Sequence, residues 1–146
     1  MTRIDRSALV NYSAEQMFEL VNDIESYPSF MSGCTEARVI SASEDELIGE
    51  LTLSRAGIRQ TLVTRNRLIP GRRMTMELVE GAFKSFSATW YFDPLTDSAC
   101  KVRLEMEFEF SGRLMDFAME KLFSSSANSL VDAVVQRARK VYGSQA

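Results

Sequence analysis

The sequence predicts an α+β fold in which a curved antiparallel sheet of seven strands wraps around one long C-terminal helix, the helix-grip architecture. Apolar and charged residues alternate along residues 101–110, which is typical of a strand with one buried and one wet face. Turn-like compositions divide residues 34–111 into six consecutive strand-length segments. After Gly112 apolar residues recur at three- and four-residue steps, which predicts a helix over residues 113–142 that is long enough to cross the whole sheet.

The remaining elements precede the six-strand series. Residues 3–11 read as a first strand. Ser13 and Gln16 have the spacing of a capping box, so a short helix is expected to begin there. A second turn or short helix is expected around Pro28. Turns are expected near residues 43–45, 56–57, 70–71, 80–82 and 94–97, and the chain is interpreted as a single domain, residues 1–146.

Composition restricts the chemistry that this chain can perform. The 146 residues include two cysteines and no histidine, which excludes Ser-His-Asp and Cys-His nucleophiles and imidazole zinc ligands. The sequence therefore favours a binding protein over an enzyme, with no catalytic residue and no metal site. Two free thiols and the lack of an export signal are typical of a cytoplasmic protein. The net charge of −3 argues against DNA as a partner.

Methionine and aromatic residues form one candidate site. Alternation along strands 73–80 and 84–93 places them on the buried face of the sheet, opposite the apolar side of the C-terminal helix. A deformable apolar cavity for a hydrophobic ligand is one interpretation, and an ordinary core that uses methionine as filler is the other. The candidate lining residues are Met74, Met76, Phe86, Trp90, Phe92, Met106, Phe108, Met115 and Met119.

A run of six arginines without any acidic residue, between positions 55 and 73, forms a second candidate site. Its predicted phosphate-binding members, for ribosomal RNA or anionic lipid headgroups, are Arg59, Arg65, Arg67, Arg72 and Arg73. The first three share strand parity and are expected to project from one face. The alternative is a solvated strand face that pairs with the acidic residues Glu36, Glu44, Asp45, Glu46 and Glu50. The carboxylate row Glu105, Glu107 and Glu109 is interpreted as another wet strand face.

Motifs along nearly the whole chain resemble one known family. The opening motif VNDIESYPSF, at 21–30, is followed by GC at 33–34. Further matching segments are TRNRL (64–68), VEGAFK (79–84), WYFDPL (90–95), CKV (100–102), FEF (108–110) and VDAVVQRA (131–138). Together they resemble the ubiquinone-binding family in the polyketide-cyclase-like branch of the START lipid-transfer superfamily. This chain has Met31, Ser32 and Gly33 where many members carry a proline, and often a tryptophan, before the cysteine.

The resemblance implies a START-like fold, an apolar cavity and no established catalytic residue. The first hypothesis is non-enzymatic binding of ubiquinone or a similar isoprenoid between the sheet and the C-terminal helix, in support of respiration or lipid transport, with peripheral membrane contact. ALV (8–10), YSAEQM (12–17) and AGI (56–58) also resemble the bacterial members that act as ribosome association toxins of toxin–antitoxin systems. The alternative is therefore a toxin that uses its basic patch on the large ribosomal subunit to block subunit association. A polyketide cyclase or dehydratase is a weaker alternative.

Overall fold

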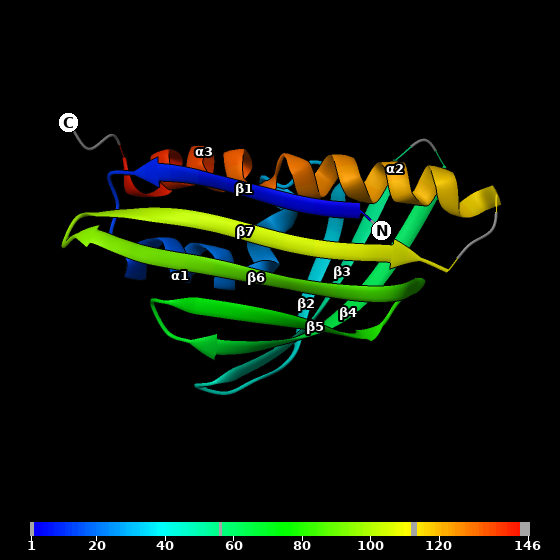
Figure 1. Cartoon of the computed structure of the whole chain (residues 1–146), viewed down its shortest axis with the longest axis horizontal. Helices are drawn as coiled ribbons and strands as arrows, with labels where there is room; N and C mark the ends of the chain where they lie inside the picture. The colour runs from blue at the N-terminus through cyan, green and yellow to red at the C-terminus, as the bar shows by residue number, and fades with distance from the viewer. Residues whose placement is uncertain (1, 56, 112–113, 144–146) are drawn as a thin grey trace.

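A seven-stranded antiparallel sheet with helices on its inner face makes up the structure, a computed structural model that describes residues 2–55, 57–111 and 114–143 (Figure 1). The elements follow one another as β1 (Thr2–Val10), α1 (Ala14–Asn22), the 3₁₀ helix η1 (Ile24–Ser29), β2 (Cys34–Ala42), β3 (Glu46–Arg55), β4 (Ile58–Ile69), β5 (Arg73–Glu80), β6 (Phe83–Thr96), β7 (Ala99–Phe110), α2 (Leu114–Asn128) and α3 (Leu130–Tyr142). The predicted helix-grip fold is confirmed, with both short helices after the first strand.

The strand order is β1-β7-β6-β5-β4-β3-β2, so the first and last strands are neighbours and β2 forms the opposite edge. Consecutive strands from β2 to β7 are joined by short turns, as expected for a meander. β2, β3 and β4 cross behind α2 at a steep angle to β6 and β7, while α2 and α3 follow one another beside β1 (Figure 1). α1 packs on β6 and β7, and α2 packs on β3 and β4. The helices therefore cover one face of the sheet.

The predicted inner face is buried along the whole length of β7. On β7 the side chains of Val102, Leu104, Met106, Phe108 and Phe110 are all buried, and the residues between them are partly exposed. Their partners on β6 stand directly opposite, with Phe92 across from Val102. Alternation along the strand thus predicted the side of the sheet that carries the core.

The predicted helix over residues 113–142 is wrong in one respect, because the helical stretch is divided at Ser129. Ser129 Oγ donates hydrogen bonds to the carbonyl oxygens of Ser125 (3.1 Å) and Ser126 (3.2 Å). Asn128 Nδ2 donates to the carbonyl of Ser124 at 2.9 Å. Such side chains compete with backbone N–H groups for the same carbonyls and bend a helix. The expected turn at 94–97 is also shorter than predicted, since β6 extends through Pro94 to Thr96.

Ser13 starts α1 with the expected reciprocal cap. Ser13 Oγ accepts a hydrogen bond from the Gln16 amide at 3.1 Å, and Gln16 Oε1 accepts from the Ser13 amide at 2.9 Å. We expect Ser13→Ala to lower the free energy of unfolding by about 1 kcal/mol, because the Gln16 amide in the first turn of α1 loses its side-chain acceptor. Urea unfolding measures this loss. Ser13→Asp keeps a capping acceptor and should retain most of the stability; equal losses in both variants would contradict a capping role.

Candidate functional site

The candidate lining residues lie on the inner face, and most of them are buried. Trp90, Met74, Phe92, Met106 and Phe108 are each no more than 5% exposed. Met76, Phe86 and Met119 are partly buried and pack against the same core cluster. The side chain of the remaining predicted residue, Met115, lies outside the described residues. The sequence therefore placed the described members on the correct face.

At one end of the inner face these residues pack against α1. The rings of Trp90 and Phe92 are stacked with centroids 6.1 Å apart, and Phe18 of α1 meets the edge of Phe92 at 5.6 Å. Ring pairs in such geometries stabilise a core beyond the area that they bury. Trp90 and Phe92 are therefore in contact with other side chains of the core, as the core interpretation expects.

Five phenylalanines meet at the other end, beneath α2. The ring of Phe123, from α2, lies 4.7 Å from Phe108 and 5.1 Å from Phe83, and it also contacts Phe86 and Phe110. The sequence analysis named Phe86 and Phe108 but not the other three as site residues. Phe123 follows the helical spacing of apolar residues, so its position on the buried side of the helix could be predicted from the sequence. Its contact with Phe83 could not be predicted, because the two residues are 40 positions apart and meet only through the docking of α2.

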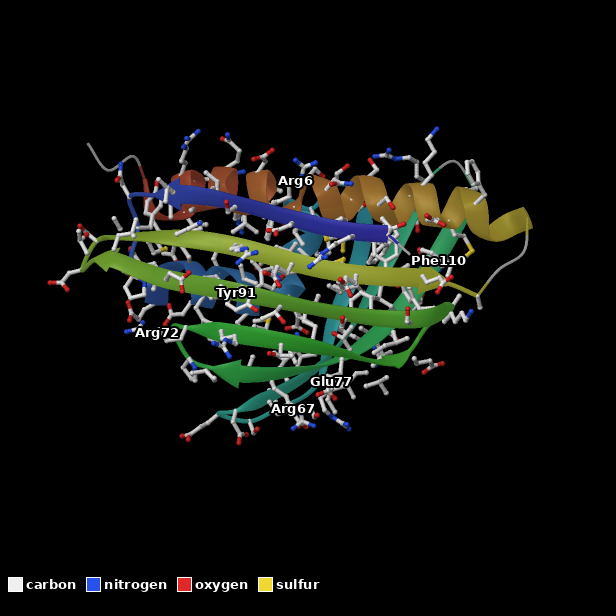
Figure 2. All side chains as sticks on the ribbon, viewed as in Figure 1. Arg6, Arg67, Arg72, Glu77, Tyr91 and Phe110 are labelled. Atoms are coloured by element: carbon white, nitrogen blue, oxygen red, sulfur yellow. The ribbon has the colours of Figure 1, made fainter. Side chains whose placement is uncertain are left out.

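The arginines of β4 project from the outer face, as their parity predicted. Arg65 contacts Glu46 of the neighbouring β3 at 3.6 Å, and Arg67 contacts Glu77 of the neighbouring β5 at 2.7 Å. Arg59 extends past β3 to Glu36 of β2, at 3.0 Å. Arg67 and Glu77 lie side by side at the lower part of the sheet in Figure 2. Arg72 extends to Glu15 of α1, at 3.0 Å.

These ion pairs are the arrangement that the solvated-face alternative expected, with two of its named partners, Glu36 and Glu46. The hydrogen bond from Arg67 lowers the pKa of Glu77, and the same contact raises the pKa of Arg67. All of these side chains are substantially exposed. Exposed pairs contribute little to stability, so their carboxylates can be exchanged for phosphate oxygens at small cost. The pairing is thus compatible with either interpretation of the arginine run.

Arg73, the fifth candidate arginine, packs against an aromatic ring. Its guanidinium lies 5.4 Å from the ring centroid of Tyr91 on β6, and Arg103 of β7 approaches the same ring at 5.8 Å. Tyr91 stands directly across from both arginines in the sheet register. Figure 2 places it near the middle of the outer face, above Arg72. The sequence analysis missed Tyr91 and Arg103, because cross-strand register is needed to bring them to Arg73.

Both cysteines of the chain are free and buried. Burial raises the pKa of the Cys34 and Cys100 thiols to about 11, so both are protonated near neutral pH. Within residues 2–55, 57–111 and 114–143, no group of three carboxylates or thiols is arranged to hold a metal ion. The same ranges contain no helix that is both long and apolar enough to span a bilayer.

Known proteins resemble this chain over nearly its full length. Residues 10–135 match the family described as polyketide cyclase / dehydrase and lipid transport. The ribosome association toxin RatA of Vibrio cholerae is 45% identical over 143 residues, which cover 98% of this chain and 99% of that protein. RatA of Escherichia coli is 40% identical over 145 residues, with 99% and 92% of the two chains covered.

Two further likenesses are more distant. The mitochondrial coenzyme Q-binding protein COQ10 homolog B of Xenopus laevis is 24% identical over 143 residues, or 95% of this chain and 59% of that protein. Among solved structures, the Zhui aromatase/cyclase of a Streptomyces species superposes with a TM-score of 0.81 at 16% identity, covering 96% of this chain and 95% of that one. At that identity the likeness concerns the fold alone.

Proposed function

We propose, from the premise that this chain belongs to the polyketide cyclase/dehydrase and lipid transport family, that it binds a ribosomal subunit and prevents the two subunits from associating. The observation that carries this proposal is the 45% identity to a ribosome association toxin over 98% of the chain. The sequence analysis placed a lipid-binding role first and this role second. The relatives reverse that order, since the coenzyme Q-binding relative is only 24% identical.

The outer face of β4 and β5 is the surface that we assign to the ribosome. Arg59, Arg65 and Arg67 project from it in a row, and Arg73 stands beside Tyr91. Guanidinium groups bind phosphate oxygens through two parallel hydrogen bonds, and aromatic rings accept unstacked bases. This surface therefore has the chemistry needed for folded RNA even though the chain as a whole is acidic, with a net charge of −3.

Sucrose-gradient sedimentation of purified bacterial subunits tests the proposal. When 30S and 50S particles are mixed in associating magnesium concentrations with an excess of this protein, we expect the 70S peak to fall and the protein to sediment with one subunit. The affinity should decrease steeply as salt rises, because each phosphate contact releases counterions. A 70S peak that is unchanged at saturating protein, with no co-sedimentation, would refute the proposal.

Binding of a hydrophobic ligand is the second candidate function. It is supported by the family, whose description includes lipid transport, and by the methionine and phenylalanine side chains of the inner face. Ubiquinone as that ligand rests on the distant relative alone. Native mass spectrometry of protein purified from its natural host tests this function. A co-purifying lipid supports it, and an empty protein that also fails to bind added quinones counts against it.

A further inference from the structure

Arg73, the first residue of β5, has no carboxylate partner among the described residues. Its outer-face neighbours on β4 and β7 each form an ion pair with a carboxylate; these are Arg59, Arg65, Arg67 and Arg103. The side chain of Arg73 is exposed. Its guanidinium can therefore accept a ligand without the loss of an ion pair that the described part of the chain provides.

The Tyr91 ring holds this guanidinium in place. Arg73 Cζ lies 5.4 Å from the centroid of the ring, and such a contact attracts the cation to the aromatic face. Arg103 contacts the same ring from β7, on the other side of β6, and its guanidinium donates hydrogen bonds of 2.9 and 3.1 Å to the Asp5 carboxylate. The ring is thus itself supported. A guanidinium that is already positioned loses less conformational freedom when a ligand binds.

The sheet register places Arg73 next to the arginine row of β4. Arg73 pairs with Ile69, and Arg67 pairs with Thr75, so the two arginines are diagonal neighbours on the outer face. Positions with this relation lie roughly 7–8 Å apart. A nucleotide whose phosphate binds Arg67 therefore has its base close to Arg73. The plane of a guanidinium stacks on the face of a base, and that face is accessible only where the RNA is unpaired.

We propose that Arg73 stacks on the base of an unpaired RNA nucleotide, with Tyr91 as the residue that positions its guanidinium. This inference rests on the ribosomal role proposed above, and it names the part of the RNA that the surface contacts: a single-stranded segment rather than a duplex. A duplex offers phosphates to the arginines of β4 as well, but its bases are stacked on one another. Arg73 and Tyr91 therefore add affinity for unpaired RNA only.

Fluorescence anisotropy of the full chain with two end-labelled probes tests this contact. One probe is a short unpaired RNA, and the other is the same strand annealed to its complement. Tyr91→Leu removes the aromatic face and should weaken binding of the unpaired strand about tenfold, while the affinity for the duplex stays unchanged. The salt dependence of this variant should equal that of the wild type, because Tyr91 neutralises no phosphate. Tyr91→Phe, the matched control, keeps the ring and should bind both probes like the wild type.

Arg73→Lys keeps the charge but removes the planar group, so it too should weaken binding of the unpaired strand and not of the duplex. The proposal is overturned if Tyr91→Leu binds the unpaired strand like the wild type, if it weakens both probes equally, or if the wild type binds neither probe at low salt.

Subunit sedimentation separates this result from the ribosomal role. If the wild type lowers the 70S peak but Tyr91→Leu binds unpaired RNA normally, the ribosomal role stands and the base contact is refuted. If binding of unpaired RNA depends on Tyr91 but the 70S peak is unchanged, the base contact stands and the ribosomal role is refuted.

Discussion

The double variant R65E/R67E is expected to bind a ribosomal subunit about a hundredfold more weakly than the wild type, whereas E46Q/E77Q is expected to bind more tightly. In the free protein Glu46 forms an ion pair with Arg65, and Glu77 forms one with Arg67. Neutralising these carboxylates releases two cations for phosphate, while reversing the arginines places two anions against RNA. A loss of roughly 1.4 kcal/mol for each reversed charge corresponds to the expected factor.

Filter binding of labelled subunits over a range of KCl concentrations measures both variants. The R65E/R67E variant should also have a shallower dependence on salt, because it neutralises fewer phosphates. R3E/K101E is the matched control, since it makes the same change in net charge on β1 and β7. β1 forms one edge of the sheet with β7 beside it, and β6 and β5 separate these two strands from β4. If R3E/K101E weakens binding as much as R65E/R67E, the effect is one of total charge and the β4 surface is not the contact.

Phe108→Ala is expected to lower the free energy of unfolding by about 3–5 kcal/mol, which is among the largest effects for a single substitution here. Phe108 is 0% exposed, and its ring contacts those of Phe83, Phe110 and Phe123. Truncation removes these contacts and leaves a cavity beneath α2. For a chain of this size the melting temperature should fall by roughly 3 °C for each kcal/mol. Guanidinium and thermal unfolding measure the loss.

This experiment also separates the two interpretations of the inner face that the sequence left open. A ring packed on all sides loses many contacts, whereas a ring that borders an open ligand cavity loses fewer. Phe117→Ala is the control, because Phe117 lies on α2 but is 74% exposed. It should change stability by no more than about 0.5 kcal/mol. A cost below about 1 kcal/mol for Phe108→Ala would contradict the packed core and favour an open cavity at this end.

The parts of the fold that could be predicted from the sequence are those that local residue patterns specify. The two-residue period along 101–110 identified β7 and its buried side, and the reciprocal spacing of Ser13 and Gln16 identified the start of α1. Both signals depend on residues only a few positions apart. The division of the C-terminal helix at Ser129 was missed for a different reason. Helical spacing of apolar residues continues across the break, and only the side-chain hydrogen bonds of Asn128 and Ser129 reveal it.

Only part of the geometry of the candidate sites could be predicted from the sequence. The parity of Arg59, Arg65 and Arg67 placed them on one outer face, but their partners depended on register. Arg67 contacts Glu77 from the next strand, and Arg72 contacts Glu15 from a helix 57 positions away. The acidic residues that precede the arginine run in the sequence were the expected partners, and that expectation included Glu36 and Glu46 but not Glu77 or Glu15.

The sequence by itself therefore determined the family, the order of strands and helices, and the side of the sheet on which the arginines of β4 and the apolar residues of β5 to β7 lie. These properties follow from motifs and from side-chain periods that act over a few residues. Only the tertiary structure decided which glutamate meets which arginine and that Tyr91 stands between Arg73 and Arg103. It alone also showed that the side chains of Gln60 and Ser126 are buried with no hydrogen-bond partner among the described residues. Hydrogen bonds and ion pairs act over about 3–4 Å, so they depend on the register and on the docking of α2, which bring distant segments together.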